Sequence, residues 1–435
     1  MKKLFLNLLL LTTLAAQAQV PVPAAPQTRP VLITGATLHV GNGTSIAGAA
    51  LAFDKGRLTY AGPASGFTVD KAGFETIDAS GQHLYPGLIL PNSTLGLTEV
   101  SAVRATVDER EVGTLNPHVR SVIAYNTDAD LLPTVRLNGV LLVQTTPRGG
   151  LLSGQSSVMQ LDAWNWQDAT VRADDGQHLN WPPLVLKLNP NEDQAALEKR
   201  QTARVVQLRE LEQLLAEAAA YRQLPAAGRP ENLRLAALAG IFDGSKTLYL
   251  HADYGKEIIE SVRFAKRLGA QKVAVVGARD AWMVLDFLKQ NDVAVVLSRV
   301  HALPRRDADD YDQPYKLPAQ LQAAGVRYCL DYEGSMETAG SRNLAFVAGT
   351  AVAYGLTQEQ ALTAITLSPA RILGLDKDYG SLEVGKSATF VLSRGDLLDM
   401  RTNAVTRAFI DGRQISLESK QTYLEKKFRG KYGLN

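Results

Sequence analysis

Residues 380–393 read GSLEVGKSATFVLS, a run of short alternating strands broken by glycine turns. The same pattern returns in AVTRAFIDGRQIS at residues 404–416. It also fills the other end of the chain, in VLITGATLHVGNGTSIAGAALAFDKGRLTYAGP at 31–63 and TIDASGQHL at 76–84. Two β segments at opposite ends of the chain predict one small composite β-sandwich, built from residues 31–85 and 380–416.

The region between them, residues 86–379, holds short runs rich in valine and leucine that do not alternate with polar residues. Such runs are typical of strands buried on both faces of a parallel sheet. We expect eight strands: Leu88–Asn92, Val140–Thr145, Val158–Leu161, Leu184–Leu188, Thr247–Leu250, Val273–Val276, Val293–Leu297 and Val326–Leu330.

Helical stretches separate several of these strands, the longest being the charged, alanine- and leucine-rich run from Asp193 to Leu224. Strand and helix in alternation, to a count near eight, favour a closed barrel. An open doubly wound sheet is the alternative, but no glycine-rich phosphate loop follows the first strand. The predicted fold class is therefore α/β, a (β/α)₈ TIM barrel over residues 86–379 plus the composite sandwich.

The N-terminus has the pattern of a secretory signal peptide over residues 1–18. Lys2 and Lys3 precede an apolar run from Leu4 to Ala15, and Ala16-Gln17-Ala18 supplies the cleavage pattern, with Gln19 as the expected mature terminus. The run is too short to span a bilayer, which needs about 20 residues. We expect a periplasmic or extracellular protein, with a proline-rich leader at 19–30 and a basic helical tail at 417–435.

Composition supports this expectation. Without Lys2 and Lys3 the basic count falls from 46 to 44 and equals the acidic count of 44, so no basic excess points to nucleic acid. The single cysteine, Cys329, cannot form an internal disulfide bond. We expect a small-molecule substrate or ligand and no membrane span in the mature protein, and a homo-oligomer is compatible with the sequence.

Three stretches resemble the amidohydrolase superfamily, in particular its imidazolonepropionase-like and related exported branches. They are HLYPGLI at 83–89, GVRYCLDYEG at 325–334 and TLSPARILGLDKDYGSLEVGKSATFVLS at 366–393. The resemblance covers essentially the whole mature chain. It implies hydrolysis of C–N bonds in amides, lactams or ring systems, with one or two divalent metals that activate water and polarise the carbonyl.

Several of the metal-ligand positions that the resemblance implies are altered in this chain. Asn92 and Thr94 replace the two histidines expected after the first strand, and Gly277 stands where the sixth strand should provide a third. His251, in LYLHAD, matches the ligand of the fifth strand, and Lys187, in LVLKLN, lies near that of the fourth.

At the eighth strand Glu333 aligns with the expected aspartate, and Asp331 lies two residues earlier. We expect Glu333 and Asp331 to be catalytic and His251, Glu333 and Lys187 to be the available metal ligands. The chain has six histidines, none in His-x-His spacing, so the resemblance predicts a reduced metal site. Zinc, another divalent metal, or no metal at all remain open.

Each candidate also has a structural interpretation. His251 fits a hydrogen-bonded core histidine, Glu333 a salt bridge to Arg342 or Arg327, and Lys187 an ordinary ion-pair partner. Arg148 follows the second strand in TTPRGGLLSG, where it fits either a contact to a carboxylate or polar ligand or a plain glycine-rich turn.

We place Arg148, Asn92 and His301 at the substrate-binding mouth, although His301 also fits a simple loop residue. Two functions therefore remain. The first is an amidohydrolase-like hydrolase of C–N bonds, other than peptide bonds, in a small cyclic or linear amide, with an atypical site. The second is a non-catalytic periplasmic binding or scaffold protein that retains the barrel, because the fold alone does not decide function.

Overall fold

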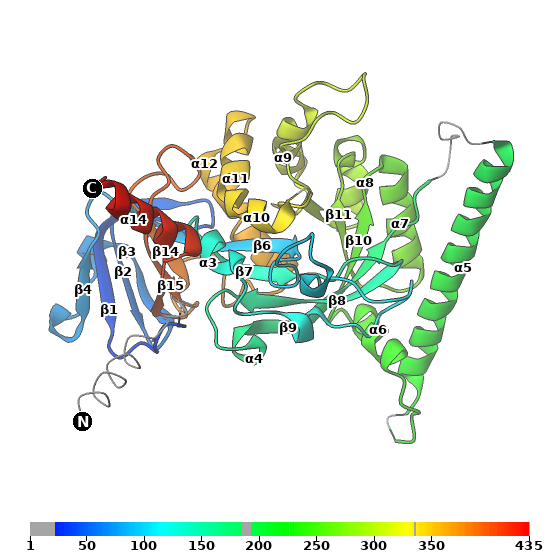
Figure 1. The fold of residues 1–435 in the computed structure, drawn as a ribbon, viewed down its shortest axis with the longest axis horizontal. Helices are drawn as coiled ribbons and strands as arrows, with labels where there is room; N and C mark the ends of the chain where they lie inside the picture. The colour runs from blue at the N-terminus through cyan, green and yellow to red at the C-terminus, as the bar shows by residue number, and fades with distance from the viewer. Residues whose placement is uncertain (1–21, 185–192, 226, 335, 435) are drawn as a thin grey trace, which may run out of the picture.

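Two β-sheets organise the molecule, and each forms its own hydrophobic core. The computed structural model describes residues 22–184, 193–225, 227–334 and 336–434. Figure 1 shows the sheet from the two ends of the chain at the left, with the C-terminal helix beside it, and the barrel with its helices to the right. This arrangement confirms the predicted fold class.

Both ends of the chain contribute strands to the first sheet, in the order β16-β15-β14-β5-β1-β2-β3, with β4 also paired to β1. The two ends meet where β14 pairs antiparallel with β5. Phe53 from one end packs against Phe390 and Phe409 from the other, with ring centroids 5.4 Å away in both cases. The strands are β1 Val31–His39, β2 Ser45–Asp54, β3 Arg57–Pro63, β4 Glu75–Asp78, β5 His83–Pro86, β14 Phe390–Ser393, β15 Val405–Ile410 and β16 Arg413–Ile415.

The barrel sheet runs in chain order from β6 to β13. Its pairs are parallel except at β8, which runs antiparallel to both β7 and β9. The prediction of eight parallel strands was therefore wrong at the third strand, because β7 and β8 are joined by a short hairpin and not by a helix. The strands are β6 Leu88–Ser93, β7 Val140–Thr145, β8 Leu152–Gln160, β9 Thr170–Asn180, β10 Thr247–Ala252, β11 Lys272–Gly277, β12 Ala294–Leu297 and β13 Tyr328–Leu330.

The fourth strand also differs from the prediction. Residues 170–180 form it, as β9, while most of the predicted Leu184–Leu188 lies outside the described residues. The sequence TVRADDGQHLN is polar and contains no apolar run, so a search for buried apolar strands passes over it. Asp175, Gln177 and His178 of this strand are nevertheless buried, because each hydrogen-bonds to a partner on another strand or segment.

The barrel closes between its last and first strands through the segment that follows α12. The Leu330 amide donates to the Ala364 carbonyl at 3.0 Å, and the Ile89 amide donates to the Ile365 carbonyl at 3.0 Å. The backbone at 364–365 thus lies between β13 and β6 and takes up hydrogen-bonding groups that the two strands would otherwise leave unpaired. This closure brings the ends of β6 and β13 side by side.

Helices cover the outside of the barrel, and the longest, α5, lies at its far edge in Figure 1. No helix in the described ranges is both long and apolar enough to cross a bilayer. The α-helices are α2 Ser121–Ala124, α3 Leu131–Arg136, α4 Trp166–Ala169, α5 Gln194–Gln223, α6 Leu233–Asp243, α7 Gly255–Arg267, α8 Leu285–Gln290, α9 Gln313–Ala324, α10 Glu337–Gly340, α11 Leu344–Ala353, α12 Gln358–Thr363, α13 Leu367–Ile372 and α14 Lys420–Tyr432. Short 3₁₀ turns lie at Ala64–Gly66, Lys71–Gly73, Arg104–Thr106, Ala281–Met283 and Ser341–Asn343.

A buried carboxylate joins the barrel to the first sheet. Asp162, which follows β8, accepts from Arg136 of α3 at 2.7 Å and from Arg413 of β16 at 2.8 Å. The side chains of Arg136 and Asp162 are each 3% exposed. Two guanidinium groups therefore depend on one carboxylate for their charge compensation.

We predict that Asp162→Asn lowers the free energy of unfolding by about 3 kcal/mol, because it leaves buried positive charge without its partner. The urea midpoint, followed by tryptophan fluorescence, measures the loss. The control is Asp168→Asn, an exposed carboxylate a few residues away, which should leave the midpoint unchanged. Equal midpoints for wild type and Asp162→Asn would show that this bridge does not stabilise the fold.

Candidate active site

The C-terminal ends of the parallel strands meet at one mouth of the barrel, where the loops of such barrels place functional residues. Asn92 lies near the end of β6, and its side-chain amide donates to Asp331, just beyond β13, at 2.8 Å. Arg148, in the hairpin after β7, donates to the Asn92 side-chain oxygen at 2.7 Å. The structure thus brings together three residues that the sequence analysis placed at this mouth.

Arg148 is the centre of this cluster. Besides its bond to the Asn92 side chain, it donates through Nη2 to the Asn92 backbone carbonyl at 2.7 Å and to Glu337 of α10 at 3.0 Å. Its side chain is only 15% exposed. The negative charges of Glu337, Glu333 and Asp331 raise the pKa of Arg148 further, against the effect of burial. The guanidinium is therefore a permanent buried cation at the barrel mouth.

The carboxyl groups around Arg148 differ in exposure. Asp331 is 1% exposed, and burial, followed by the nearby charges of Glu333 and Glu337, raises its pKa well above the usual value. Glu333 is partly exposed and accepts a hydrogen bond from the Ser298 hydroxyl at 3.3 Å. Glu337 accepts from the Thr94 amide at 2.8 Å, and burial raises its pKa. The mouth therefore holds a buried carboxyl beside a solvent-reaching one.

His251, near the end of β10, is paired with a second histidine. Its Nε2 lies 2.9 Å from Nδ1 of His178 on β9, so one of the two nitrogens donates to the other. Burial and, next, the charge of Arg148 lower the pKa of His251 to about 3. Burial and the neighbouring His251 lower the pKa of His178 well below its usual value. Both imidazoles are consequently neutral at physiological pH.

A layer of polar side chains below the mouth fixes these groups. The backbone amide of Asn92 donates to the Gln144 side-chain oxygen at 3.0 Å, and the Gln144 side-chain amide donates to Asp175 at 2.8 Å. Asp175 also accepts from Ser156 at 2.7 Å and from Tyr249 at 3.0 Å. The Tyr249 ring stacks on His178 with centroids 4.6 Å apart. The layer links strands β6 to β10 and holds the imidazole pair and Asn92 in one orientation.

One predicted site residue, His301, does not join this cluster, and the position of another is not described. Lys187 lies outside the described residues. His301 is an exposed residue of the loop after β12, and its Nε2 lies 2.7 Å from the Thr350 hydroxyl of α11, as expected of the loop residue that the sequence also allowed.

The sequence analysis missed His178, Gln144, Asp175 and Glu337. His178 and Asp175 lie on β9, and assigning that strand would have placed both inside the barrel. Glu337 had no sequence signal, since its position depends on how α10 folds over the mouth.

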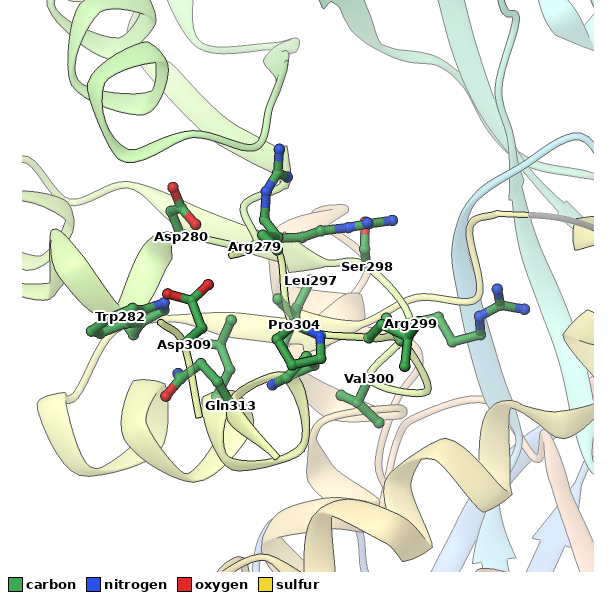
Figure 2. A pocket seen from close by; sticks show the side chains of 15 residues that line it. Arg279, Asp280, Trp282, Leu297, Ser298, Arg299, Val300, Pro304, Asp309 and Gln313 are labelled. Atoms are coloured by element: carbon green, nitrogen blue, oxygen red, sulfur yellow. The ribbon is translucent and has the colours of Figure 1, made fainter. Parts of the chain in front are cut away.

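A small cavity of about 20 Å³ lies beside the ends of β11 and β12. Figure 2 shows Asp280, Trp282 and Asp309 towards one end and Arg299 extended at the other. Ser298, which also lines it, hydrogen-bonds to Glu333, so the cavity adjoins the carboxyl groups of the mouth. Its volume leaves room for little more than one water molecule.

Comparison with known proteins places this architecture. Residues 248–415 match the amidohydrolase family. The superfamily resemblance found in the sequence is thereby confirmed. An imidazolonepropionase from Flavobacterium psychrophilum is 28% identical over 109 residues, which are 23% of this chain and only 26% of that relative.

Solved structures agree with the fold. An amidohydrolase from Thermotoga maritima superposes with a TM-score of 0.76 at 20% identity, covering 89% of this chain and 99% of that one. An adenosine deaminase from Xanthomonas campestris with bound zinc gives a TM-score of 0.53 at 15% identity, covering 94% and 99%. At these identities the likeness establishes the barrel and its attached sheet, and the chemistry has to be argued from the site.

Amidohydrolases generally use divalent metal, so the donor set at this mouth can be tested against one. The Asn92 side-chain oxygen and Glu337 already accept from Arg148, and Nε2 of His251 faces His178. At about 4 Å each pair of unit positive charges repels by about 4 kcal/mol near a protein surface, so a divalent ion beside Arg148 would be opposed strongly. No group of three histidine, cysteine, aspartate or glutamate side chains in the described ranges is arranged to hold a metal. The described residues of the mouth therefore do not fit the family's metal.

The backbone conformation at two of the altered ligand positions also differs from that of an ordinary histidine ligand. Gly277 has φ +92°, and a Cβ there would lie 2.7 Å from a carboxylate oxygen of Asp253. Asn92 has φ +46°, a left-handed conformation that asparagine tolerates better than most residues. A histidine at position 277 would therefore be strained.

The amidohydrolase mouth also generates a pH-dependent prediction. Burial raises the pKa of Asp175 above its unfolded value near 3.8. The folded protein therefore binds more protons than the unfolded one between these two pKa values, and this group's stabilising contribution is lost as pH rises through the folded pKa. Asp175→Asn removes the titration and keeps an oxygen for Gln144 and Tyr249, so the variant should gain stability relative to wild type between pH 4 and pH 8.

Urea unfolding of both proteins at pH 4, 6 and 8 measures this difference. Asp307→Asn, at an exposed carboxylate, is the control and should stay parallel to wild type. A difference between Asp175→Asn and wild type that stays constant across this range would contradict the prediction.

Proposed function

We propose that the protein is an amidohydrolase-type hydrolase that cleaves the C–N bond of a small cyclic or linear amide, other than a peptide bond, at this mouth. One observation carries the proposal: a paired imidazole, two carboxyl groups on the last strand end and a cation converge on one partly open site. Convergence of these groups at the C-terminal face of a barrel is the arrangement from which such enzymes draw their catalytic residues.

The carboxyl groups have distinct roles in the proposed reaction. Glu333, which reaches solvent, accepts a proton from water as the water oxygen bonds to the carbonyl carbon. Asp331, buried two residues earlier, gives its proton to the leaving nitrogen as the C–N bond breaks. Water and amide are converted to an acid and an amine, and the two groups exchange protons with solvent to return to their starting state. Paired carboxyl groups in different environments commonly divide acid and base roles in this way.

The neutral imidazole of His251 orients the substrate. Because His178 holds one of its nitrogens, the ring can present only its remaining edge and its face to the mouth.

A second function, ligand binding without turnover, is favoured by a different observation. Arg148, Asn92, Glu337 and Asp331 satisfy one another's hydrogen bonds, which is the expected condition of a cluster kept for structure. In this alternative the barrel binds a small molecule at its mouth, and the clustered residues only maintain the shape of the mouth.

The two functions separate on site variants. We expect Glu333→Gln and His251→Gln each to lower kcat/KM on small amide or lactam substrates at least 100-fold, because Glu333 takes the proton of the attacking water and His251 orients the substrate. Matched controls are Glu231→Gln and His118→Gln, both exposed and without a role in the proposed reaction, which should retain full activity. Absence of turnover in wild-type protein, with retained ligand-induced stabilisation, would favour the binding function.

We also propose that the chain is exported and cleaved after residue 18, on the strength of its N-terminal sequence. Mass spectrometry of protein from the periplasm or medium should give a mature N-terminus at or near Gln19. Recovery of the uncleaved chain in the membrane fraction would show that the segment is retained as an anchor.

A further inference from the structure

We propose that the guanidinium of Arg148 takes the place of the divalent metal of related sites, so that this barrel mouth is built to work without one. That Arg148 occupies the place of the metal follows from the geometry alone, while the catalytic role assigned to Arg148 rests on the hydrolase function proposed above. The proposal concerns a residue that the sequence placed only at the substrate-binding mouth.

The first step is how the chain delivers Arg148 to this position. The residue lies in the hairpin between β7 and β8, where Gly149 and Gly150 both have positive φ. The Arg148 amide donates to the Glu109 carbonyl at 2.7 Å, and a Cβ on Gly150 would lie 2.9 Å from the Thr114 carbonyl oxygen. The hairpin is thus packed closely against residues 109–114, and its arginine is held in place by the backbone.

The second step is what the guanidinium contacts. It reaches residues from both strands that flank the barrel closure, through Asn92 near the end of β6 and through the charges of Asp331 and Glu333 beyond β13. These strand ends are where the family resemblance places metal ligands. A cation already compensates the carboxyl groups there, and Asn92 points its oxygen at that cation and its amide at Asp331.

The third step is what the guanidinium can do for a substrate. It has five N–H groups, and its contacts within the described residues use three of them. The others remain for a carbonyl oxygen, whose negative charge grows as water adds to the carbonyl carbon. A fixed cation in a poorly solvated site stabilises such charge without reorganising. Unlike a bound metal, it is not removed by a chelator.

Metal analysis of the wild type tests directly whether Arg148 stands in place of a metal. We expect protein purified without a polyhistidine tag to contain less than 0.1 equivalent of zinc, manganese, iron or nickel by mass spectrometry. Addition of zinc or manganese, or of EDTA, should shift the melting temperature by less than 1 °C. One equivalent of tightly held metal, or a chelator-sensitive melting temperature, would overturn the proposal whether or not the protein hydrolyses anything.

Variants test whether Arg148 is the group that excludes the metal. Asn92→His with Thr94→His restores two imidazoles, and we expect this pair to bind zinc at least 100-fold more weakly than the same pair combined with Arg148→Met. Gly277 is left unchanged because of its backbone. Arg110→Met in the double-histidine background is the matched control, since Arg110 lies beside the same hairpin but is exposed, and it should not improve binding. Equal zinc affinity with and without Arg148 would overturn the proposal.

The catalytic part has its own readout. Where wild-type protein hydrolyses an amide, Arg148→Lys should lower kcat more than 10-fold with a small change in KM, and EDTA should leave the rate unchanged. Circular dichroism checks that each Arg148 variant is folded, and the wild-type metal analysis decides occupancy if Arg148→Met does not fold. A wild-type protein that holds no metal and shows no turnover would contradict the proposed hydrolase function, but Arg148 would still stand in place of the metal. Turnover that EDTA abolishes would show that Arg148 does not replace the metal.

Discussion

The contact between Arg148 and Asn92 is the interaction on which the rest of the barrel mouth depends. It ties the hairpin after β7 to the end of β6, and through the amide of Asn92 it extends to Asp331 beyond β13. The same asparagine donates its backbone amide to Gln144, which starts the polar layer below. Without this contact, three carboxyl groups would face one another at the mouth with no cation between them.

An arginine and a metal impose different demands on the residues around them. A metal needs deprotonated lone pairs at close, nearly fixed distances. A guanidinium is planar and donates N–H hydrogen bonds to a carbonyl oxygen, an amide oxygen or a carboxylate. Asparagine at position 92 suits the second case, because it supplies a side-chain oxygen and a backbone carbonyl to one arginine. Burial keeps His251 neutral, and the nearby positive charge of Arg148 lowers its pKa further.

Much of the fold could be predicted from the sequence because its strands are local apolar runs. β6, β7 and β10 to β13 lie where valine and leucine cluster, and the paired β segments at the chain ends met in one sheet as expected. β9 could not be found in this way, since Asp175, Gln177 and His178 are buried by hydrogen bonding and not by apolar character. At the mouth, Asn92, His251 and Asp331 followed from strand ends, but Glu337 did not, because only the folded chain brings α10 to Arg148.

The reversed strand β8 also affects how the site forms. Two successive hairpins replace two crossovers, so Gln144, Ser156 and Asp175, which hydrogen-bond to one another, lie within 31 residues along the chain. Contacts between residues near in sequence close small loops and form early in folding. The support of the mouth can therefore assemble as a local meander before the distant ends of the chain meet. We expect the late step in folding to be the docking of β13 and the closing segment onto a half-barrel whose polar interior is already in place.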